Sequence, residues 1–534
     1  MTDIAFPIAC SIGRVKLQAC DLARMEYEAA ANQPTRLTLD LVGNNLYNPG
    51  WNKDAETVEL GSVVSFSLTP GGKTQPQTLF KGLLTERMLV KDGSDVLLRL
   101  VCHCSAVKAG VGALGAVKKD KIQDGALIEE VLRAAGVALA DKQAKADSEH
   151  PQRVLPPISP WLYARHLAAA NGLVLVSSAD GVALHDPQAK SKAQLFKLGL
   201  SALLSLELAE DAEDAIPEAS VDAWSIKEQS TPATQPAKAD DAQSAPAGKL
   251  GRKALKTRNA APIPKTACEA LARARVTRAA LASRQGSVEI VGYPPARVGD
   301  WIELDNVPKS LQSGFWVGGV HVTLDKHSLR STLQLGLEPE RFDPPSPLPP
   351  PPLMTGVIQP YQDDPAALMR LPVKLMGIPD PDNIAFARLV TPLAGNERGL
   401  YLPPQPDDEV VIGFLGDAWD WPVILGATHN PKQKPPFPYG KEMPKNGLVL
   451  EKDKQQLVFD AKDQNLILGN DADTDLKLSK KDGLAARRGK DLLKLAKGAA
   501  LQSPDNGLKL SGKAGEIKSD GALDIKVGSS VNIS

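Results

Sequence analysis

Residues 446–534 contain a series of very short apolar segments separated by turn residues, and this pattern limits what the chain can fold into. The clearest segments are 448–450, 457–459, 466–468 and 476–478, with Asp, Asn and Gly between them. A short, nearly fixed period is typical of repeat architectures, in which each unit buries its apolar side chains only against its neighbours. Strands this short leave unpaired edges, which proteins remove by closing the sheet or by winding around identical partners. The pattern predicts an intertwined fibre, which is a mechanical part rather than a catalyst.

The regularity of this pattern varies along the tail. It is clear over 446–478, whereas 484–502 is rich in Lys, Arg and Ala, a composition that indicates partly helical structure. We therefore expect the fibre to be interrupted between 480 and 505 and to resume at 508–510 and 523–533. The apolar side chains predicted to hold the fibre together are Leu448, Leu450, Leu457, Phe459, Leu466, Leu468, Leu508, Leu510, Ile525 and Val527.

Length and composition exclude several classes of protein. The 534 residues allow roughly three to four domains of about 150 residues each. The formal net charge of -1 gives no overall positive field that would attract nucleic acid or an anionic membrane. The 5 cysteines are scattered, unlike a secreted disulfide framework. The N-terminus has no secretory signal, and no stretch is long and apolar enough to span a membrane. We expect synthesis in the cytoplasm and export by another route.

Two compositional breaks divide the chain. Residues 227–262 are rich in Ala, Pro, Gln, Lys and Asp without apolar periodicity, which predicts a flexible insertion. Residues 342–353 are mostly proline, which predicts a stiff polyproline II linker. The resulting divisions are 1–226, the insertion 227–262, then 263–341, the linker 342–353, a β module at 354–430, a second linker at 431–445 and the tail at 446–534.

The N-terminal half is predicted to be mostly strands with a few helices. Residues 36–42 and 63–68 alternate between apolar and polar, as half-buried strands do. One helix is expected to begin at Asp124, with this residue as its cap, and a second to cover 159–171. A third is expected over 268–283, followed by strands over 287–337. This order favours two α+β or barrel-like subdomains.

The module at 354–430 contains closely spaced short strands. They are expected at 356–358, 371–375, 386–390, 399–402, 409–414 and 422–426. About five short strands in such a length suit a small barrel of the OB type. The glycines assigned to this fold are Gly395, Gly399, Gly413 and Gly426.

The residues of this module resemble a known family. The motifs, in order, are Phe386-Ala-Arg-Leu-Val-Thr-Pro-Leu-Ala-Gly395, Gly399-Leu-Tyr-Leu-Pro-Pro404, Asp408-Glu-Val-Val-Ile-Gly-Phe414 and Trp421-Pro-Val-Ile-Leu-Gly426. Together they resemble the OB-domain signature of VgrG-type spike proteins, which serve type VI secretion systems, tailed-phage baseplates and extracellular contractile injection particles. Segments similar to the hub region of that family are Leu60-Gly-Ser-Val-Val64, the residues from Pro160 to Gly172, Gly299-Asp-Trp-Ile-Glu-Leu304 and Gly314-Phe-Trp-Val-Gly-Gly-Val320.

The resemblance implies a mainly β protein with minor α content. Its parts would be tandem hub barrels at 1–226 and 263–341, an OB barrel, and a C-terminal intertwined triple-stranded β-helix. In such proteins the paired hub barrels form a pseudo-hexameric ring within a homotrimer, which adapts a sixfold tube to a threefold spike. The implied function is that of a trimeric spike and tube-capping hub that pierces target membranes mechanically.

The resemblance also implies partners. A PAAR-repeat tip protein would dock near Val531 and Ile533, and inner-tube and baseplate subunits would contact the hub. Effector cargo is a further possible partner, and the target membrane would be contacted only transiently. The protein would be assembled in the injection particle and then delivered outside the cell or into the target. The sequence does not separate the three kinds of injection system, although the lack of an effector extension favours phage-like or extracellular particles.

Three short motifs suggest chemistry, but each has a simpler structural interpretation. Residues 110–115 satisfy a dinucleotide-binding spacing, yet no helix opens at these glycines, so a loop is expected. Gly72-Lys73-Thr74 lacks the first glycine of a phosphate loop and suits a hairpin tip. Cys102 and Cys104 would share one face of a strand, with His103 on the other, which suits core cysteines better than a metal site. We expect no cofactor, no metal and no catalytic residues.

Two alternative functions come from other classes of protein. A spike with cell-wall hydrolase activity would need an additional domain, and residues 431–445 are too few to hold one. An OB-fold nucleic-acid-binding protein would need a basic groove with stacking aromatics. Here Trp419 and Trp421 lie beside Asp417 and Asp420, which gives the wrong sign of charge. We therefore expect a structural protein with no enzymatic activity.

Overall fold

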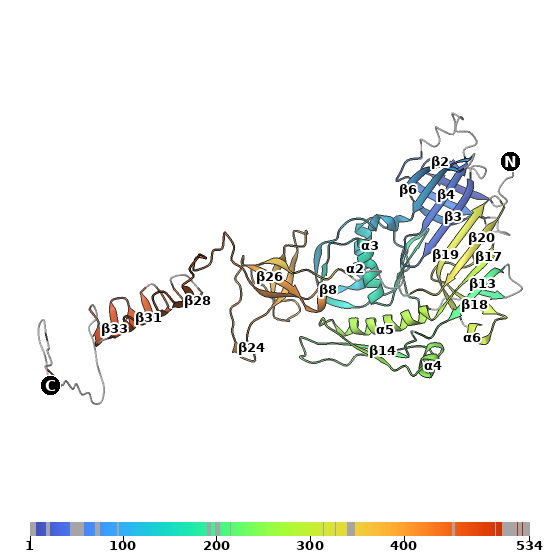
Figure 1. Ribbon diagram of the computed structural model, residues 1–534. Helices are drawn as coiled ribbons and strands as arrows, with labels where there is room; N and C mark the ends of the chain where they lie inside the picture. Colours follow the sequence, from blue (N-terminus) through green and yellow to red (C-terminus); the bar gives the residue numbers. More distant parts are fainter. Residues whose placement is uncertain are drawn as a thin grey trace. The chain divides into compact units, whose positions relative to one another are not determined.

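The computed structural model describes residues 7–17, 22–42, 58–69, 75–92, 95–189, 194–197, 203–213, 215–312, 314–325, 327–338, 348–450, 454–471, 473–496, 498–504, 521 and 526. The chain divides into two compact units, Met1–Thr428 and His429–Ser534. The first unit contains a large sheet, a group of helices and a small barrel, and the second contains a sheet of short strands (Figure 1).

The largest element of the first unit is a 13-stranded sheet. Its strands are β1 (Ile8–Ile12), β2 (Val15–Leu17), β3 (Leu22–Ala30), β4 (Arg36–Val42), β5 (Val63–Leu68), β6 (Gln77–Asp92), β7 (Asp95–His103), β12 (Gln194–Lys197), β13 (Leu203–Glu210), β17 (Arg284–Val291), β18 (Trp301–Asp305), β19 (Phe315–Asp325) and β20 (Leu329–Leu335). The predicted strands 36–42 and 63–68 are confirmed as β4 and β5. Leu37 and Leu39 are both fully buried because alternate residues of a strand face the same side.

The hub strands form one continuous sheet instead of the two barrel-like subdomains expected from the order of elements. Strand β19 pairs with β20 on one side and with β3 on the other, and β12–β18 and β13–β17 are further pairs between the first and closing parts of the hub. His321 of β19 lies opposite Glu28 of β3. Sequence patterns give strand positions but not strand partners, which is why this seam could not be predicted.

Helices and short hairpins cover part of the sheet. They are η2 (Ser105–Ala109), β8 (Ala116–Gln123), α2 (Asp124–Ala134), β9 (Glu149–Leu155), α3 (Pro160–Ala170), β10 (Val174–Ser178), β11 (Gly181–His185), α5 (Lys265–Ala282) and α6 (Lys309–Gln312). The three predicted helices are confirmed as α2, α3 and α5. Helix α3 begins as expected, because the Ser159 hydroxyl accepts a hydrogen bond from the Leu162 amide and Pro160 occupies the first turn.

Residues 227–262, expected to be flexible, contain regular structure. With β14 (Glu218–Ala223), they form a three-stranded sheet through β15 (Ala237–Lys238) and β16 (Leu255–Asn259), and they also contain α4 (Asp241–Lys249). Val221 and Ala223 of β14 pack with Cys268 and Ala272 of α5 in a small core. The expectation was wrong because most of the apolar core comes from residues that flank the segment, while the segment itself supplies backbone pairing and a few alanines such as Ala237.

The module at 354–430 is a closed five-stranded barrel, as expected. Its strands are β21 (Met354–Ile358), β22 (Arg370–Leu375), β23 (Ile384–Leu389), β26 (Glu409–Phe414) and β27 (Pro422–Ala427), with the hairpin β24 (Ala394–Gly395) and β25 (Arg398–Gly399) and the turn η3 (Leu415–Asp417) between them. Residues 342–347 of the predicted proline linker lie outside the described residues. The following Pro349 is held against the barrel, because its carbonyl accepts a hydrogen bond of 2.8 Å from Trp419 Nε1.

Two of the three short motifs lie in the described residues. Residues 110–115 form a loop after η2, and Gly72-Lys73-Thr74 lies outside the described residues. Cys102 and Cys104 are free thiols in the main core, and burial raises the pKa of Cys102 to about 12. Within the described part of the chain, no helix is long and apolar enough to cross a bilayer.

Candidate assembly surface and the hub–barrel joint

The second unit contains a seven-stranded antiparallel sheet in which each strand pairs with the next along the chain. Its strands are β28 (Lys445–Val449), β29 (Gln456–Asp460), β30 (Asn465–Gly469), β31 (Thr474–Ser479), β32 (Gly483–Arg488), β33 (Asp491–Leu495) and β34 (Ala499–Gln502). The turn after β29 is fixed by the Asp460 carboxylate, which accepts hydrogen bonds from the amides of Lys462 and Asp463.

Residues 484–502 continue this sheet, so the expected helical interruption is wrong. Leu484 lies opposite Leu478 on one side and opposite Leu495 on the other. The Lys, Arg and Ala content misled the prediction because helix propensity is weak and strand pairing overrides it. The alternation Leu493-x-Leu495 was the signal that could have identified the strand.

One face of the tail sheet carries two columns of apolar side chains. The register places Phe459 opposite Leu466 and Leu457 opposite Leu468, and the same pairing continues along the sheet. We define the tail face by these residues: Leu448, Leu457, Phe459, Leu466, Leu468, Leu476, Leu478, Leu484, Leu493, Leu495 and Leu501. They share a face because side chains alternate along each strand.

The tail face is exposed in the single chain. Phe459 is 51% exposed, Leu468 54% and Leu495 47%. On the opposite face, Val458 is buried, and Lys477 and Lys494 follow farther along the sheet. Contiguous exposed apolar surface of this kind marks an interaction site. This arrangement allows the leucines to be buried against another apolar surface.

The structure brings together part of the predicted set of fibre residues. Leu448, Leu457, Phe459, Leu466 and Leu468 lie on the tail face. Leu450 follows β28 directly and is 59% exposed. Leu508, Leu510, Ile525 and Val527 lie outside the described residues, as do the predicted tip-docking residues Val531 and Ile533. Leu493, Leu495 and Leu501 were not predicted, because their segment was expected to be partly helical.

The four predicted barrel glycines differ in whether the structure could accommodate a side chain at that position. Gly399 has φ +154°, and a Cβ there would lie 2.6 Å from the Leu393 carbonyl oxygen, so a side chain would force the hairpin to move. A Cβ on Gly395 would meet the flexible end of the Arg398 side chain, and one on Gly413 would contact Leu425. Gly426 has open space around it. Only Gly399 therefore combines an unusual backbone conformation with a close backbone contact.

The barrel and the hub share a joint that the sequence did not reveal. The hub hairpin β8–β9 contributes Val117 and Val154 to the buried core of the barrel. Gln152 of the same hairpin forms hydrogen bonds with barrel backbone groups. Its amide nitrogen donates to the carbonyls of Phe386 at 3.0 Å and Asp420 at 2.8 Å, and its amide oxygen accepts from the Phe386 amide. The barrel is therefore part of the first compact unit rather than a separate module.

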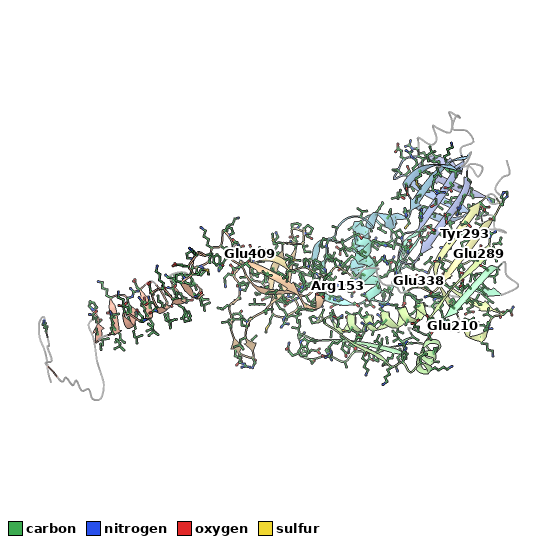
Figure 2. All side chains as sticks on the ribbon, viewed as in Figure 1. Arg153, Glu210, Glu289, Tyr293, Glu338 and Glu409 are labelled. Atoms are coloured by element: carbon green, nitrogen blue, oxygen red, sulfur yellow. The ribbon has the colours of Figure 1, made fainter. Side chains whose placement is uncertain are left out.

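Arg153 occupies the centre of this joint (Figure 2). Its guanidinium donates to Asp420 Oδ2 of the barrel at 2.7 Å and, through Nε, to Asp124 Oδ1 of the hub at 3.1 Å. The side chains of Arg153, Asp124 and Asp420 are 12%, 2% and 14% exposed. Asp124 was expected to cap α2, but it is the first residue of that helix and its carboxylate is directed to this network.

The electrostatics of the joint favour the charged form of the Asp124 carboxylate and the neutral form of His166. Burial would raise the pKa of Asp124, but the Arg153 charge and the hydrogen bonds from His150 and Asn171 outweigh it and lower that pKa to about 2. Burial, with the nearby positive charge of Arg153, lowers the pKa of His166 to about 4. A buried ion network of this kind costs several kcal/mol to break, roughly 3–5 kcal/mol when one partner is removed. The joint thus fixes the barrel to the hub.

Comparisons with known protein families agree with this architecture. Residues 354–429 match the type VI secretion system and phage-baseplate injector OB domain. Residues 61–326 match a family described as the Alg8 N-terminal domain. No match is found among curated protein sequences.

Two solved structures have similar folds at low sequence identity. The first is an Escherichia coli protein, c3393, described as a component of the type VI secretion system with structural similarity to the T4 phage tail proteins gp27 and gp5. It is 14% identical, with a TM-score of 0.51, and the alignment covers 78% of this chain and 99% of the other. The second, a chain of the half-lidded Francisella PdpA–VgrG complex, is 9% identical, with a TM-score of 0.55 over 90% of this chain and 87% of the other. Residues 354–429 therefore match the injector OB domain of type VI secretion systems and phage baseplates, and the fold is similar to those of a type VI secretion component and of a chain in a PdpA–VgrG complex.

Proposed function

We propose that this protein is the central spike and tube-capping hub of a contractile injection machine and that it works as a homotrimer. The observation that carries the proposal is the exposed tail face, which lies in the same chain as an injector OB domain. An apolar sheet face needs a partner, and two further copies of the same face would supply one of matching size and shape. Hub, barrel and tail would then follow the order of a tube cap, a neck and a needle.

The strand pairing suggests how the needle is built. Neighbouring strands of residues 445–502 already hydrogen-bond to each other within one chain. In our proposal each chain supplies one complete sheet, and three sheets pack with their tail faces inward as the three sides of a prism. This arrangement differs over these residues from the intertwined triple-stranded β-helix predicted from the sequence. It also covers the exposed leucines of the tail face, and it does so without strands crossing between chains.

The joint gives the proposed machine a rigid neck. A spike that is driven through a membrane carries a compressive load from the hub to the needle. Arg153 ties Asp124 of the hub to Asp420 of the barrel, and Gln152 joins the same two parts through backbone groups. In this proposal the joint resists bending, and the protein acts mechanically without enzymatic activity. Its partners would be inner-tube and baseplate subunits, a PAAR-repeat tip protein near Val531 and Ile533, effector cargo and, transiently, the target membrane.

The mass of the purified full-length protein tests the trimer directly. Native mass spectrometry and light scattering are expected to give three times the chain mass of 56.8 kDa. The double variant Leu468→Lys and Leu478→Lys places two charges on the tail face and is expected to give monomers. Ala485→Lys puts a charge on the opposite face, next to Lys477 and Lys494, and should leave the trimer intact. A folded monomer from the parent chain would contradict the proposal.

A further inference from the structure

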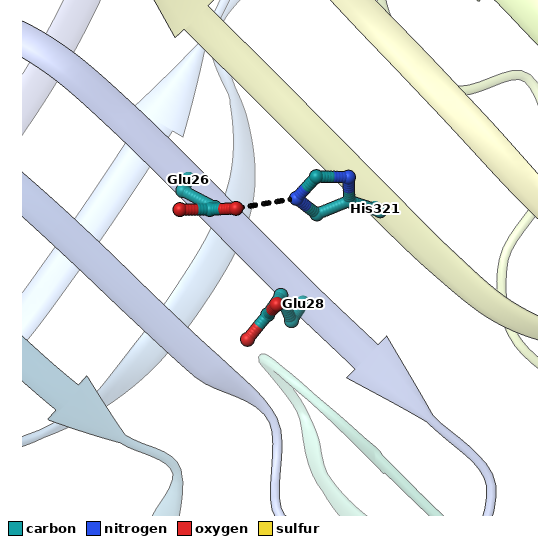
Figure 3. A group of neighbouring side chains, drawn as sticks. All are labelled: Glu26, Glu28 and His321. Carbon is teal, nitrogen blue, oxygen red and sulfur yellow. Dashed lines mark hydrogen bonds and ion pairs between the residues drawn. The ribbon is translucent and has the colours of Figure 1, made fainter.

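The seam between β3 and β19 carries a group of side chains that the proposed function does not use. Glu26 and Glu28 project from β3 on one face of the sheet, and His321 comes from β19 (Figure 3). Glu26 and His321 are 295 positions apart in the sequence. Their strands join the first and closing parts of the hub. The face is accessible in the described unit, since Glu26 is 30% exposed and His321 35%.

The geometry of this group suits a metal ion. One ligand atom from each of the three residues can be chosen so that all lie within 4.8 Å of one another. His321 Nε2 already lies 2.8 Å from Glu26 Oε1. Ligand atoms about 2.0–2.2 Å from a shared ion lie roughly 3 Å apart, so side-chain rotation alone can bring this set into place. The backbone need not move, because the strand register holds the three side chains together.

The simpler interpretation is a network of cross-strand ion pairs. Arg24 lies 3.6 Å from Glu26 and Arg36 lies 3.5 Å from Glu28. Both distances are long for charge-assisted hydrogen bonds, and both arginine side chains are about half exposed, at 54% and 45%. Exposed pairs of this kind contribute little, so they would be displaced readily by a more strongly held ion. Two carboxylates with an imidazole form a donor set that suits zinc and similar transition metals.

We propose that Glu26, Glu28 and His321 bind a divalent transition-metal ion of the zinc class at this seam. The ion would take the place of the hydrogen bond between Glu26 and His321, with water in its remaining coordination positions. It would tie the closing part of the hub to the first part of the chain, as a clamp on the β3–β19 strand pair. The proposal does not depend on the trimer, because all three ligands come from one chain.

Zinc binding to the full-length, untagged protein tests the site. After treatment with a chelator, calorimetric titration with Zn²⁺ is expected to show one ion per chain, and Mg²⁺ is expected not to compete, because it prefers all-oxygen sites. The variants His321→Gln and Glu28→Gln should each weaken zinc binding roughly tenfold or more. Zinc should also raise the unfolding temperature of the parent by about 2–4 °C, and this increase should be lost in both variants.

His327→Gln is the matched control. His327 is an exposed histidine close to the same strand and outside the proposed site, so its replacement should leave zinc affinity unchanged. Far-ultraviolet circular dichroism establishes that each variant is folded before the comparison is made. If the parent binds no zinc, or if His321→Gln and Glu28→Gln bind it as tightly as the parent does, the proposed site is wrong.

Discussion

The OB barrel and the tail sheet are both made of short β-strands, but the barrel buries its apolar side chains and the tail sheet leaves many of them exposed. In the barrel, Ile358, Ile412 and Ile424 are fully buried, and the hub hairpin adds Val117 and Val154 to the same core. In the tail, Phe459 and Leu468 are more than half exposed. Closure lets five strands make a core of their own, whereas an open sheet of seven leaves one face uncovered. The first region buries its apolar side chains within the chain, whereas the proposed trimer would cover those of the second.

The largest expected effect tests whether the first region is held together internally. Arg153→Met leaves Asp124 and Asp420 buried without their cation, so the free energy of unfolding should fall by about 3–5 kcal/mol. Lys118 lies directly opposite Arg153 in the same hairpin and makes an exposed ion pair with Glu130, so Lys118→Met should cost about 1 kcal/mol or less. Urea unfolding followed by tryptophan fluorescence measures both. Equal effects would mean that the joint does not fix the barrel to the hub.

A pair of core truncations sharpens the comparison itself. Ile412→Ala creates a cavity in the barrel and should lower the free energy of unfolding by about 2–5 kcal/mol at any protein concentration. Leu468→Ala should have little effect on an isolated chain but should weaken the trimer, so its effect should grow as the protein is diluted. Thermal unfolding at several protein concentrations separates the two. A concentration-independent loss for Leu468→Ala would argue that the tail face is covered within its own chain.

The effect of pH on the free energy of unfolding, through the joint, should be intermediate in size. The pKa of Asp124 is lowered from 3.8 to about 2, so its stabilisation is fully present above pH 3.8 and is lost as the pH falls towards 2. The shift corresponds to about 2 kcal/mol. The pKa of His166 is lowered to about 4, so the unfolded chain gains a proton first and stability falls from about pH 6.5 towards pH 4.

Urea midpoints measured between pH 7 and pH 2 should therefore decline in two stages. Asp124→Asn should remove the stage near pH 3, and His166→Gln should remove the earlier one. A decline that is unchanged in both variants would place the titrating groups elsewhere in the molecule.

The smallest expected effect concerns the barrel glycines. Gly399→Ala should cost about 1 kcal/mol or more because of its positive φ and the nearby Leu393 carbonyl. Gly426→Ala should be close to neutral, since its Cβ would meet no other atom within 4 Å. Differential scanning calorimetry of the two variants measures the difference. If both glycines tolerate alanine equally, the hairpin β24–β25 is free to adjust.

Local patterns predicted the elements of the fold better than their partners. The strands at 36–42 and 63–68, the helix expected over 159–171 and the five-stranded barrel follow from alternation, helix-terminus residues and turn residues, all of which act over a few positions. The joint could not be predicted, because Gln152 and Arg153 reach barrel residues more than 230 positions away. Polar side chains are typical of exposed positions, and only the fold shows these two in a buried interface.

The sequence by itself determined where this chain makes short strands, where it turns, and that residues 448–468 present apolar side chains at regular intervals. These features depend on neighbouring residues, so they can be recognised without a structure. The tertiary structure decided that the hub is one continuous sheet, that the barrel is fixed to it by Arg153, and that the strands through β34 form a single apolar face. These features result from strand register and long-range pairing. Both depend on which distant segments meet and on the contacts formed there.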